Sequence, residues 1–418
     1  MFQKSILGNR WKYLLASWQQ LDWQLLIICI GLTFLGGVMI RSAELYNGQT
    51  DWWWHWFIGS IGLAIALFIA KSRYELLIQW HWLVYGITIL GLIAVMLFGN
   101  TANGSQRWLT LAGGIQIQPS EFAKIGLIIT LAAVLHAKPA STLGGFLRVL
   151  AVAAVPWTFV FLEPNLGTSL VFGCITMGML YWGNANPGWL LLMLSPIVSA
   201  IVFNAYLPAW FVWVAAMVVI GWRTFSFPLV GAISALVVNA VSGELGHILW
   251  GVLKDYQKDR LILFLDPDKD PLGGGYHLIQ SRIAIGAGGA WGRGLNQGTQ
   301  TQLRFIPEQH TDFIFSAIGE ELGFAGCIVV LCAFWFLCLR LIIIAQTAKD
   351  NFGSLLAIGV LSMIVFQTVV NIGMNIGLAP ITGIPLPLLS YGRSSLLANF
   401  LAIGLVESVA NHRHRLKF

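Results

Sequence analysis

Charged residues are scarce in this 418-residue chain. Asp, Glu, Lys and Arg make up 10% of it, whereas soluble domains carry about 25%. Hydrophobic residues account for 57%, and many of them stand in long uninterrupted runs. Such runs match the roughly 20 apolar residues that one helix needs to cross a bilayer. The composition therefore excludes an ordinary soluble domain and predicts a membrane protein.

Cysteine pairs and alternating strand patterns are also lacking. The five cysteines are an odd number, all lie within apolar runs, and none forms a C-x-x-C pair. This argues against a disulfide framework or a cysteine metal site, and small core residues are the simplest interpretation. The apolar runs show no period-two alternation, which argues against barrel strands. We also see no cleavable signal peptide, so we expect the first span to act as the signal.

The apolar runs predict twelve membrane spans in one domain that covers residues 1–418. The fold class is therefore all-α, a polytopic membrane helical bundle of about 10–12 transmembrane helices. Two spans, 207–222 and 226–246, are interrupted by Pro or Gly and must be present or absent together. The predicted spans are 21–42, 53–70, 77–98, 121–137, 146–162, 167–183, 187–205, 207–222, 226–246, 313–340, 352–378 and 395–411.

The positions of Lys and Arg predict how the chain is oriented in the membrane. Most of those in short loops, such as Lys71, Arg73 and Lys138, fall on one side when both termini are cytoplasmic. This places residues 247–312 outside the membrane as one large extracytoplasmic loop. The net charge of +6 is then explained by topology, so no nucleic-acid partner is expected.

Three aspartates are concentrated in the large loop. Asp266, Asp268 and Asp270 alternate with Pro267, Lys269 and Pro271 and therefore lie on a turn rather than in a helix. A solvated surface turn accounts for Asp266 and Asp268. Asp270 differs because it precedes a proline and three glycines, where backbone can approach a ligand closely. The spacing could also hold a divalent cation, although a metal loop normally supplies more ligands.

Residues 282–295 predict an amphipathic segment in the membrane interface. We expect Ile283, Ile285, Trp291 and Leu295 to point inward. The glycine-rich run within it resembles a dinucleotide fingerprint, but no strand precedes it, so cofactor binding is not expected.

A second candidate site lies at the start of the span at 121–137. We expect Ser120 to cap this helix, with Glu121 in the first turn and Lys124 one turn later on the same face. Glu121 has a simple structural explanation, because an acid in the first turn complements the helix dipole. A lysine near the centre of a span costs about 2.5–3.5 kcal/mol, so Lys124 should face a cavity and a partner.

Two further segments predict a polar cavity. Asp312, Ser316 and Glu320 recur every four residues and would share one face of the span 313–340, either lining a hydrated cavity or forming a salt-bridged structural helix. Further on, Asn371 and Asn375 share a face, and prolines break the helix after them. Irregular backbone at membrane depth must be buried in protein or line a water-filled space.

Four stretches together resemble the SEDS family (shape, elongation, division and sporulation). They are "GSQRWLTL" with "QPSEFAK", "DPLGGGYHLIQSRIAIGAGG", "GTQTQLRFIPEQHTDFIF", and "NIGMNIGLAPITGIPLPLLSYG". "GTQTQLRF" resembles the rod-shape (RodA-like) branch rather than the division (FtsW-like) branch. The resemblance implies a peptidoglycan glycosyltransferase that polymerises lipid II at the outer face of the cytoplasmic membrane. It also implies membrane lipids, a class B penicillin-binding protein and other elongation-complex proteins as partners.

The resemblance also implies site residues. The essential aspartate of the family matches Asp270 as the catalytic residue, and its arginine, glutamate and lysine match Arg107, Glu121 and Lys124. Further candidates for substrate binding are Gln280, Ser281, Asp312 and Glu320. Asp270 would act as general base or would hold a divalent cation such as Mg or Mn. We assign no set of metal ligands. A lipid II flippase and a noncatalytic scaffold are the alternative functions.

The chain departs from the family pattern at three places. Glu163, Pro164 and Asn165 stand where the family usually has Gln-Pro-Asp, so the role of that acid could have moved. Gly392 is followed by Arg393 where the family usually has a second glycine. The family usually has ten spans, and the surplus near 205–250 has no assigned counterpart.

Overall fold

The computed structural model describes most of the chain. The described residues are 21–44, 52–102, 105–110, 116–163, 165–252, 270, 275–303, 305–306 and 308–413. Asp266 and Asp268 of the predicted acidic turn therefore lie outside the described residues.

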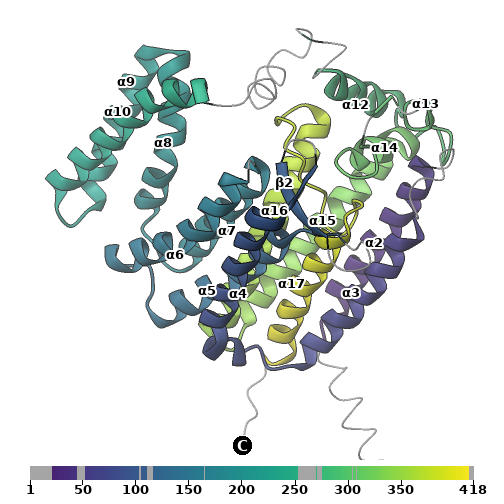
Figure 1. The fold of residues 1–418 in the computed structure, drawn as a ribbon, viewed down its shortest axis with the longest axis horizontal. Helices are drawn as coiled ribbons and strands as arrows, with labels where there is room; N and C mark the ends of the chain where they lie inside the picture. The colour runs from purple at the N-terminus through teal and green to yellow at the C-terminus, as the bar shows by residue number, and fades with distance from the viewer. Residues whose placement is uncertain are drawn as a thin grey trace, which may run out of the picture.

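The structure confirms a polytopic helical membrane protein (Figure 1). Within the described residues, eleven helices are long and apolar enough to cross a membrane. A twelfth helix, α7, is apolar but has only 17 residues. The long helices and α7 are α2 (Trp23–Ala43), α3 (Trp53–Lys71), α4 (Leu76–Phe98), α5 (Pro119–Ala137), α6 (Leu143–Leu162), α7 (Leu166–Trp182), α8 (Pro187–Ala205), α9 (Leu207–Thr224), α10 (Pro228–Val252), α15 (Gly323–Thr347), α16 (Asn351–Ile376) and α17 (Arg393–Asn411).

The two interrupted spans are both present, as α9 and α10. They pack with α8 into a three-helix group beside the main bundle (Figure 1). Asn239 is buried at its centre, donating to Ser195 Oγ at 3.1 Å and accepting from Trp213 Nε1 at 3.2 Å. Polar side chains within a membrane are stabilised by such interhelical hydrogen bonds. The buried Asn239 side chain therefore finds its hydrogen-bond partners within this three-helix group.

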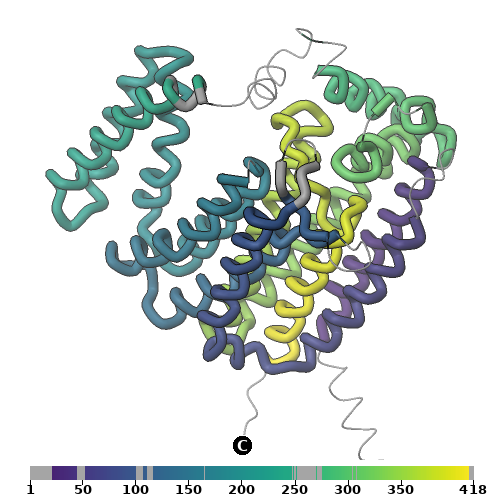
Figure 2. Tube along the Cα trace, in the orientation of Figure 1, coloured from purple at the N-terminus to yellow at the C-terminus, as the bar shows by residue number. Residues whose placement is uncertain are grey.

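The core of the main bundle is formed by α5, α16 and α17. The last helix, α17, packs along α3 (Figure 2). A Cβ on Gly62 would lie 2.7 Å from the Phe400 ring, and one on Gly404 would lie 2.7 Å from Ala66 Cα. These glycines therefore allow the two helices to approach closely, as small residues do in membrane bundles.

A small antiparallel sheet was not predicted from the sequence. Its order is β1 (Asn100–Ala102), β2 (Ser105–Thr110), β3 (Gln116–Ile117), with Leu109 paired to Ile117. β2 contacts α4 and α5, and β3 leads directly into α5. We call the end of the bundle that carries this sheet the sheet end.

The predicted large loop contains two helices among its described residues, α12 (Tyr276–Ala287) and α13 (Thr299–Gln302), and α10 extends into it. The prediction that four apolar side chains of this segment point inward is largely wrong. Ile283, Trp291 and Leu295 are exposed, and only Ile285 packs against the core. The physical reason is that α12 packs between α14 and α16 through small residues, Ser281 and Ala284, together with Leu278.

The predicted span 313–340 is divided into α14 (Ile314–Glu321) and the membrane helix α15. Gly323, the first residue of α15, has φ of +67°, a left-handed conformation that the interior of a continuous right-handed helix cannot contain. A Cβ there would lie 2.2 Å from the backbone nitrogen of Gly292, so this junction packs tightly against the loop after α12. Asp312 precedes α14 and does not belong to a helix, contrary to the prediction that it shares a helix face with Ser316 and Glu320.

Candidate active site

The start of α5 places an ion pair inside the bundle. Lys124 Nζ lies 2.7 Å from Glu121 Oε2, and both side chains are buried. The prediction that Lys124 has a partner is confirmed. The prediction that Ser120 caps the helix is wrong: Gln118 occupies the cap position without a side-chain bond, and Pro119 supplies the first turn.

Arg107 and Glu163 are two further ionisable residues at the sheet end. Arg107 lies on β2 and is partly buried, while Glu163 follows the last residue of α6 and is only 3% exposed. Burial raises the pKa of Glu163 to about 8, although the positive charge of Arg107 acts to lower it. The sequence pointed to Glu163 only as a departure from the family pattern.

The segment between α16 and α17 is irregular, as the prolines predicted. α16 ends at Ile376 and is followed by Gly377, which has φ of +79°. The side-chain amides of two asparagines in α16 hold the irregular segment in place. Asn371 Nδ2 donates to the carbonyls of Asp312 at 2.9 Å and Ile384 at 2.8 Å, and Asn375 Nδ2 donates to Asp312 at 3.1 Å. This confirms that the two asparagines share a face.

The irregular segment contacts both the start of α7 and Asp312. A Cβ on Gly167, in the first turn of α7, would lie 2.8 Å from the Thr382 carbonyl. A Cβ on Gly383 would lie 3.5 Å from Asp312 Oδ2. The segment therefore connects the α6–α7 turn that carries Glu163 with the Asp312 side of the site.

The residues on α12 have different surroundings. Ser281 is fully buried, with its Oγ 2.5 Å from Ser316 Oγ and donating to the Asn375 carbonyl at 2.7 Å. It therefore joins α12 to α14 and α16. Gln280 is partly exposed, and Asp270 is exposed near the start of this helix, where its carbonyl accepts from Gly275 N–H at 3.0 Å.

Glu320 is also fully buried and its carboxylate is engaged by α13. It accepts from the backbone N–H groups of Gln300 and Thr301, both at 2.8 Å, from Thr301 Oγ1 at 2.6 Å and from Thr299 Oγ1 at 3.3 Å. A carboxylate is well suited to the free N–H groups at a helix start. In this geometry Glu320 stabilises α13.

We therefore expect Glu320→Gln to lower the free energy of unfolding by about 1–3 kcal/mol, because buried donors lose their acceptor. Hydrogen exchange should accelerate at the amides of Gln300 and Thr301. Glu244→Gln, at an exposed position of α10, is the control and should change neither quantity. Unchanged exchange at the α13 amides would contradict the anchoring role.

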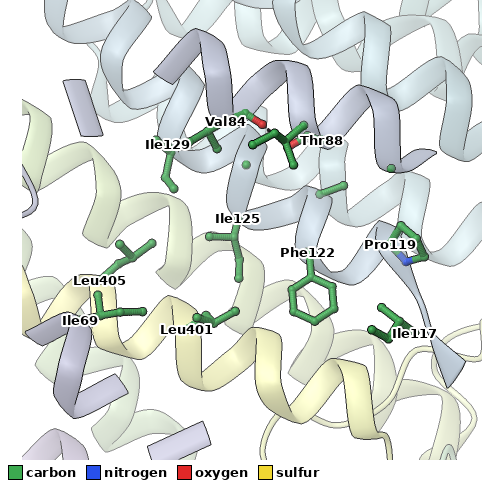
Figure 3. A pocket seen from close by; sticks show the side chains of 14 residues that line it. Ile69, Val84, Thr88, Ile117, Pro119, Phe122, Ile125, Ile129, Leu401 and Leu405 are labelled. Carbon is green, nitrogen blue, oxygen red and sulfur yellow. Dashed lines mark hydrogen bonds between the residues drawn. The ribbon is translucent and has the colours of Figure 1, made fainter. Parts of the chain in front are cut away.

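An apolar groove of about 470 Å³ lies beside the start of α5 (Figure 3). α3, α4, α5 and α17 form its walls, from Ile117 and Pro119 at one end to Ile69 and Leu405 at the other. Phe122 lines the groove, whereas Glu121 and Lys124 are not among its lining residues. Its almost wholly apolar lining is suited to a hydrocarbon chain.

Among the described residues, no three His, Cys, Asp or Glu side chains come together as a metal site would require. Asp270 is the single member of the acidic turn whose position is described.

Comparisons with known proteins identify the family of this chain. A family model described as "Cell cycle protein", covering FtsW, RodA and SpoVE, matches residues 22–220 and 189–415. The chain is 36% identical to peptidoglycan glycosyltransferase MrdB of Escherichia coli K12 over 402 residues, covering 95% of each chain. It is 34% identical to peptidoglycan glycosyltransferase RodA of Treponema pallidum, covering 93% of this chain and 97% of that one.

A solved structure supports the fold. A chain from a peptidoglycan synthase complex that coordinates polymerization and crosslinking superimposes with a TM-score of 0.70 at 30% identity. The match covers 94% of this chain and 99% of the other. With the family model matching nearly the whole chain, this protein belongs to the SEDS family and is RodA-like.

Proposed function

We propose that this protein is a peptidoglycan glycosyltransferase that polymerises lipid II during cell elongation. The observation that carries the proposal is the buried Glu121–Lys124 pair at the start of α5, next to an apolar groove. Lys124 and Arg107 supply positive charge for a diphosphate, and the groove accepts a polyprenyl chain. The names of the relatives MrdB and RodA support the same activity.

The sheet end faces the outside of the cytoplasmic membrane in this proposal, and both termini are cytoplasmic. Lys71, Arg73 and Lys138 then lie on the cytoplasmic side, as the positive-inside rule requires. Arg107, Glu121 and Asp270 lie on the outer side, where glycan strands are made.

The reaction forms one glycosidic bond and breaks one bond to phosphate. The acceptor 4-hydroxyl attacks the anomeric carbon, the bond to the lipid diphosphate breaks, and the α linkage becomes β. Asp270 takes the hydroxyl proton as general base. Lys124 and Arg107 stabilise the negative charge of the departing diphosphate, and Glu121 orients Lys124.

The other predicted residues divide into two roles. Gln280 and Asp312, both partly exposed, remain candidates for contact with the sugars or peptide of the substrate. Ser281 and Glu320 act through the fold, because their oxygens are engaged by neighbouring helices. A divalent cation such as Mg or Mn at Asp270 is the alternative to its role as base, and would stabilise the leaving group.

We propose a class B penicillin-binding protein as the main partner, with other elongation-complex proteins. The similar chain in the peptidoglycan synthase complex supports this assignment. The partner would crosslink the strands that this protein polymerises.

The function is tested with the purified protein in liposomes that contain labelled lipid II, with and without the partner and with and without Mg or Mn. Glycan chains are the expected product. Translocation of fluorescent lipid II without polymer would instead support a flippase, and neither product under any condition would support a scaffold.

A further inference from the structure

Arg393, the first residue of α17, is an exposed arginine at the sheet end of the bundle. The positive-inside rule does not account for it, because this end faces outward in the proposed orientation. Among the described residues, no acidic side chain forms an ion pair with it. Its positive charge is therefore available to a ligand.

Two aromatic residues hold the Arg393 guanidinium in place. Its Cζ lies 5.4 Å from the centre of the Trp54 ring, and its Nε donates to the Tyr391 hydroxyl at 3.4 Å. A cation at this distance is attracted to the face of an indole, and tryptophans are typical of the headgroup level of a membrane. The terminal amino groups of the guanidinium can then bind an anion at the depth of lipid phosphates.

A hydrogen bond joins the start of α17 to the start of α5. Ser394 Oγ accepts from Gln118 N–H at 3.0 Å. Gln118 stands between Ile117 and Pro119, which form the sheet end of the apolar groove (Figure 3). Arg393 directly precedes Ser394, so it lies beside the mouth of this groove.

The groove mouth needs a cation that is not already neutralised. Lys124 pairs with Glu121 at 2.7 Å, so the two buried side chains together carry no net charge. An arginine can hold a phosphate through two parallel N–H bonds, which gives it both strength and specificity. Arg393 offers this group where the polar head of a lipid would emerge from the groove.

We propose that Arg393 binds the diphosphate of a polyprenyl diphosphate lipid whose hydrocarbon chain occupies the groove. The identity of this lipid rests on the proposed function. Trp54 and Tyr391 are positioning residues that orient the guanidinium. A bulk phospholipid presents the same phosphate chemistry, and the experiment separates the two sources.

The experiment measures binding of labelled polyprenyl diphosphate to the full-length protein in nanodiscs of phosphatidylcholine. Arg393→Gln should weaken the affinity about tenfold, because a hydrogen-bonded contact to a charged group is lost. The matched control is Arg41→Gln, which should bind as the wild type does. Arg41 is also exposed at the sheet end, 5.2 Å over Trp52, but it belongs to α2, which does not line the groove.

Three results would overturn the proposal: no binding of the probe to the wild type, wild-type affinity in Arg393→Gln, or an equal loss in Arg41→Gln. Phosphatidylglycerol that competes as well as unlabelled polyprenyl diphosphate would also overturn it, because the site would then bind headgroups in general. Thermal unfolding checks each variant, and Arg393→Gly provides the same comparison if the Gln variant does not fold.

Binding does not depend on polymerisation. Probe binding that depends on Arg393 without glycan chains supports the inference while the proposed function fails. Glycan chains with unchanged binding in Arg393→Gln have the reverse meaning.

Discussion

Asp270→Asn should abolish polymerisation of lipid II, lowering kcat by about 10²–10⁴, the usual contribution of a general base. Asn keeps the size of the side chain and leaves the backbone bond from Gly275 N–H to the Asp270 carbonyl intact. The exposed position of Asp270 means that stability should not change. The measurement is single-turnover polymerisation with labelled lipid II, with thermal unfolding as the check on folding.

Asp270→Glu and added Mg or Mn distinguish base from cation ligand. A base role predicts partial activity in the Glu variant without a metal requirement. A cation role predicts wild-type activity that is lost on chelation and restored by the metal. Full polymerisation by Asp270→Asn, with or without metal, would remove Asp270 from the mechanism.

The buried pair at the start of α5 gives the second large effect. Glu121→Ala or Lys124→Ala should each lower the free energy of unfolding by about 3–5 kcal/mol, because one buried charge is left without its partner. The double variant Glu121→Leu with Lys124→Met should be close to wild-type stability, since apolar replacement of a whole buried pair is often neutral. It should nevertheless be inactive, because it lacks the cation that binds the diphosphate.

Thermal unfolding and polymerisation are measured on all three variants. The matched control is Glu75→Gln, which removes the partly exposed pair with Lys349 at the other end of the bundle and should cost only about 0–1 kcal/mol. Normal polymerisation by the stable double variant would show that the pair is structural and that Lys124 does not bind substrate.

Most of the membrane helices could be predicted because length and hydrophobicity decide them. Parity of the spans required the doubtful pair, α9 and α10, to be present or absent together, and the structure contains both. The sheet at residues 100–117 was missed because its strands are two to six residues long and are stabilised by α4 and α5 rather than by their own pattern. The break at Gly323 was missed because the predicted span 313–340 was continued through Glu320, Glu321 and Gly323 to join the long apolar run that follows them.

Site residues could be predicted where the free-energy cost of placing a charged side chain in an apolar span drew attention to them. Lys124 stood out because a lysine in an apolar span requires a partner, and the structure supplied Glu121. Ser281 and Glu320 show the limit of such reasoning, because polarity within a motif does not reveal that Asn375 or the start of α13 already engages the side chain. Glu163 shows the same limit, because the sequence marked it only as a departure from the family pattern and its burial is visible only in the fold.

The packing of α17 on α3 has a consequence for biogenesis. Besides the glycine contacts, Ser408 Oγ donates to the Ser72 carbonyl at 2.6 Å, and Asn411 Nδ2 donates to the Ala70 carbonyl at 3.0 Å. During synthesis, α3 enters the membrane among the first helices, whereas α17 is the last described helix to leave the ribosome. The glycine-lined face of α3 therefore remains exposed to lipid for nearly the whole of translation. In a chain truncated before residue 393, this face has no α17 to pack against and stays accessible to membrane quality-control proteases.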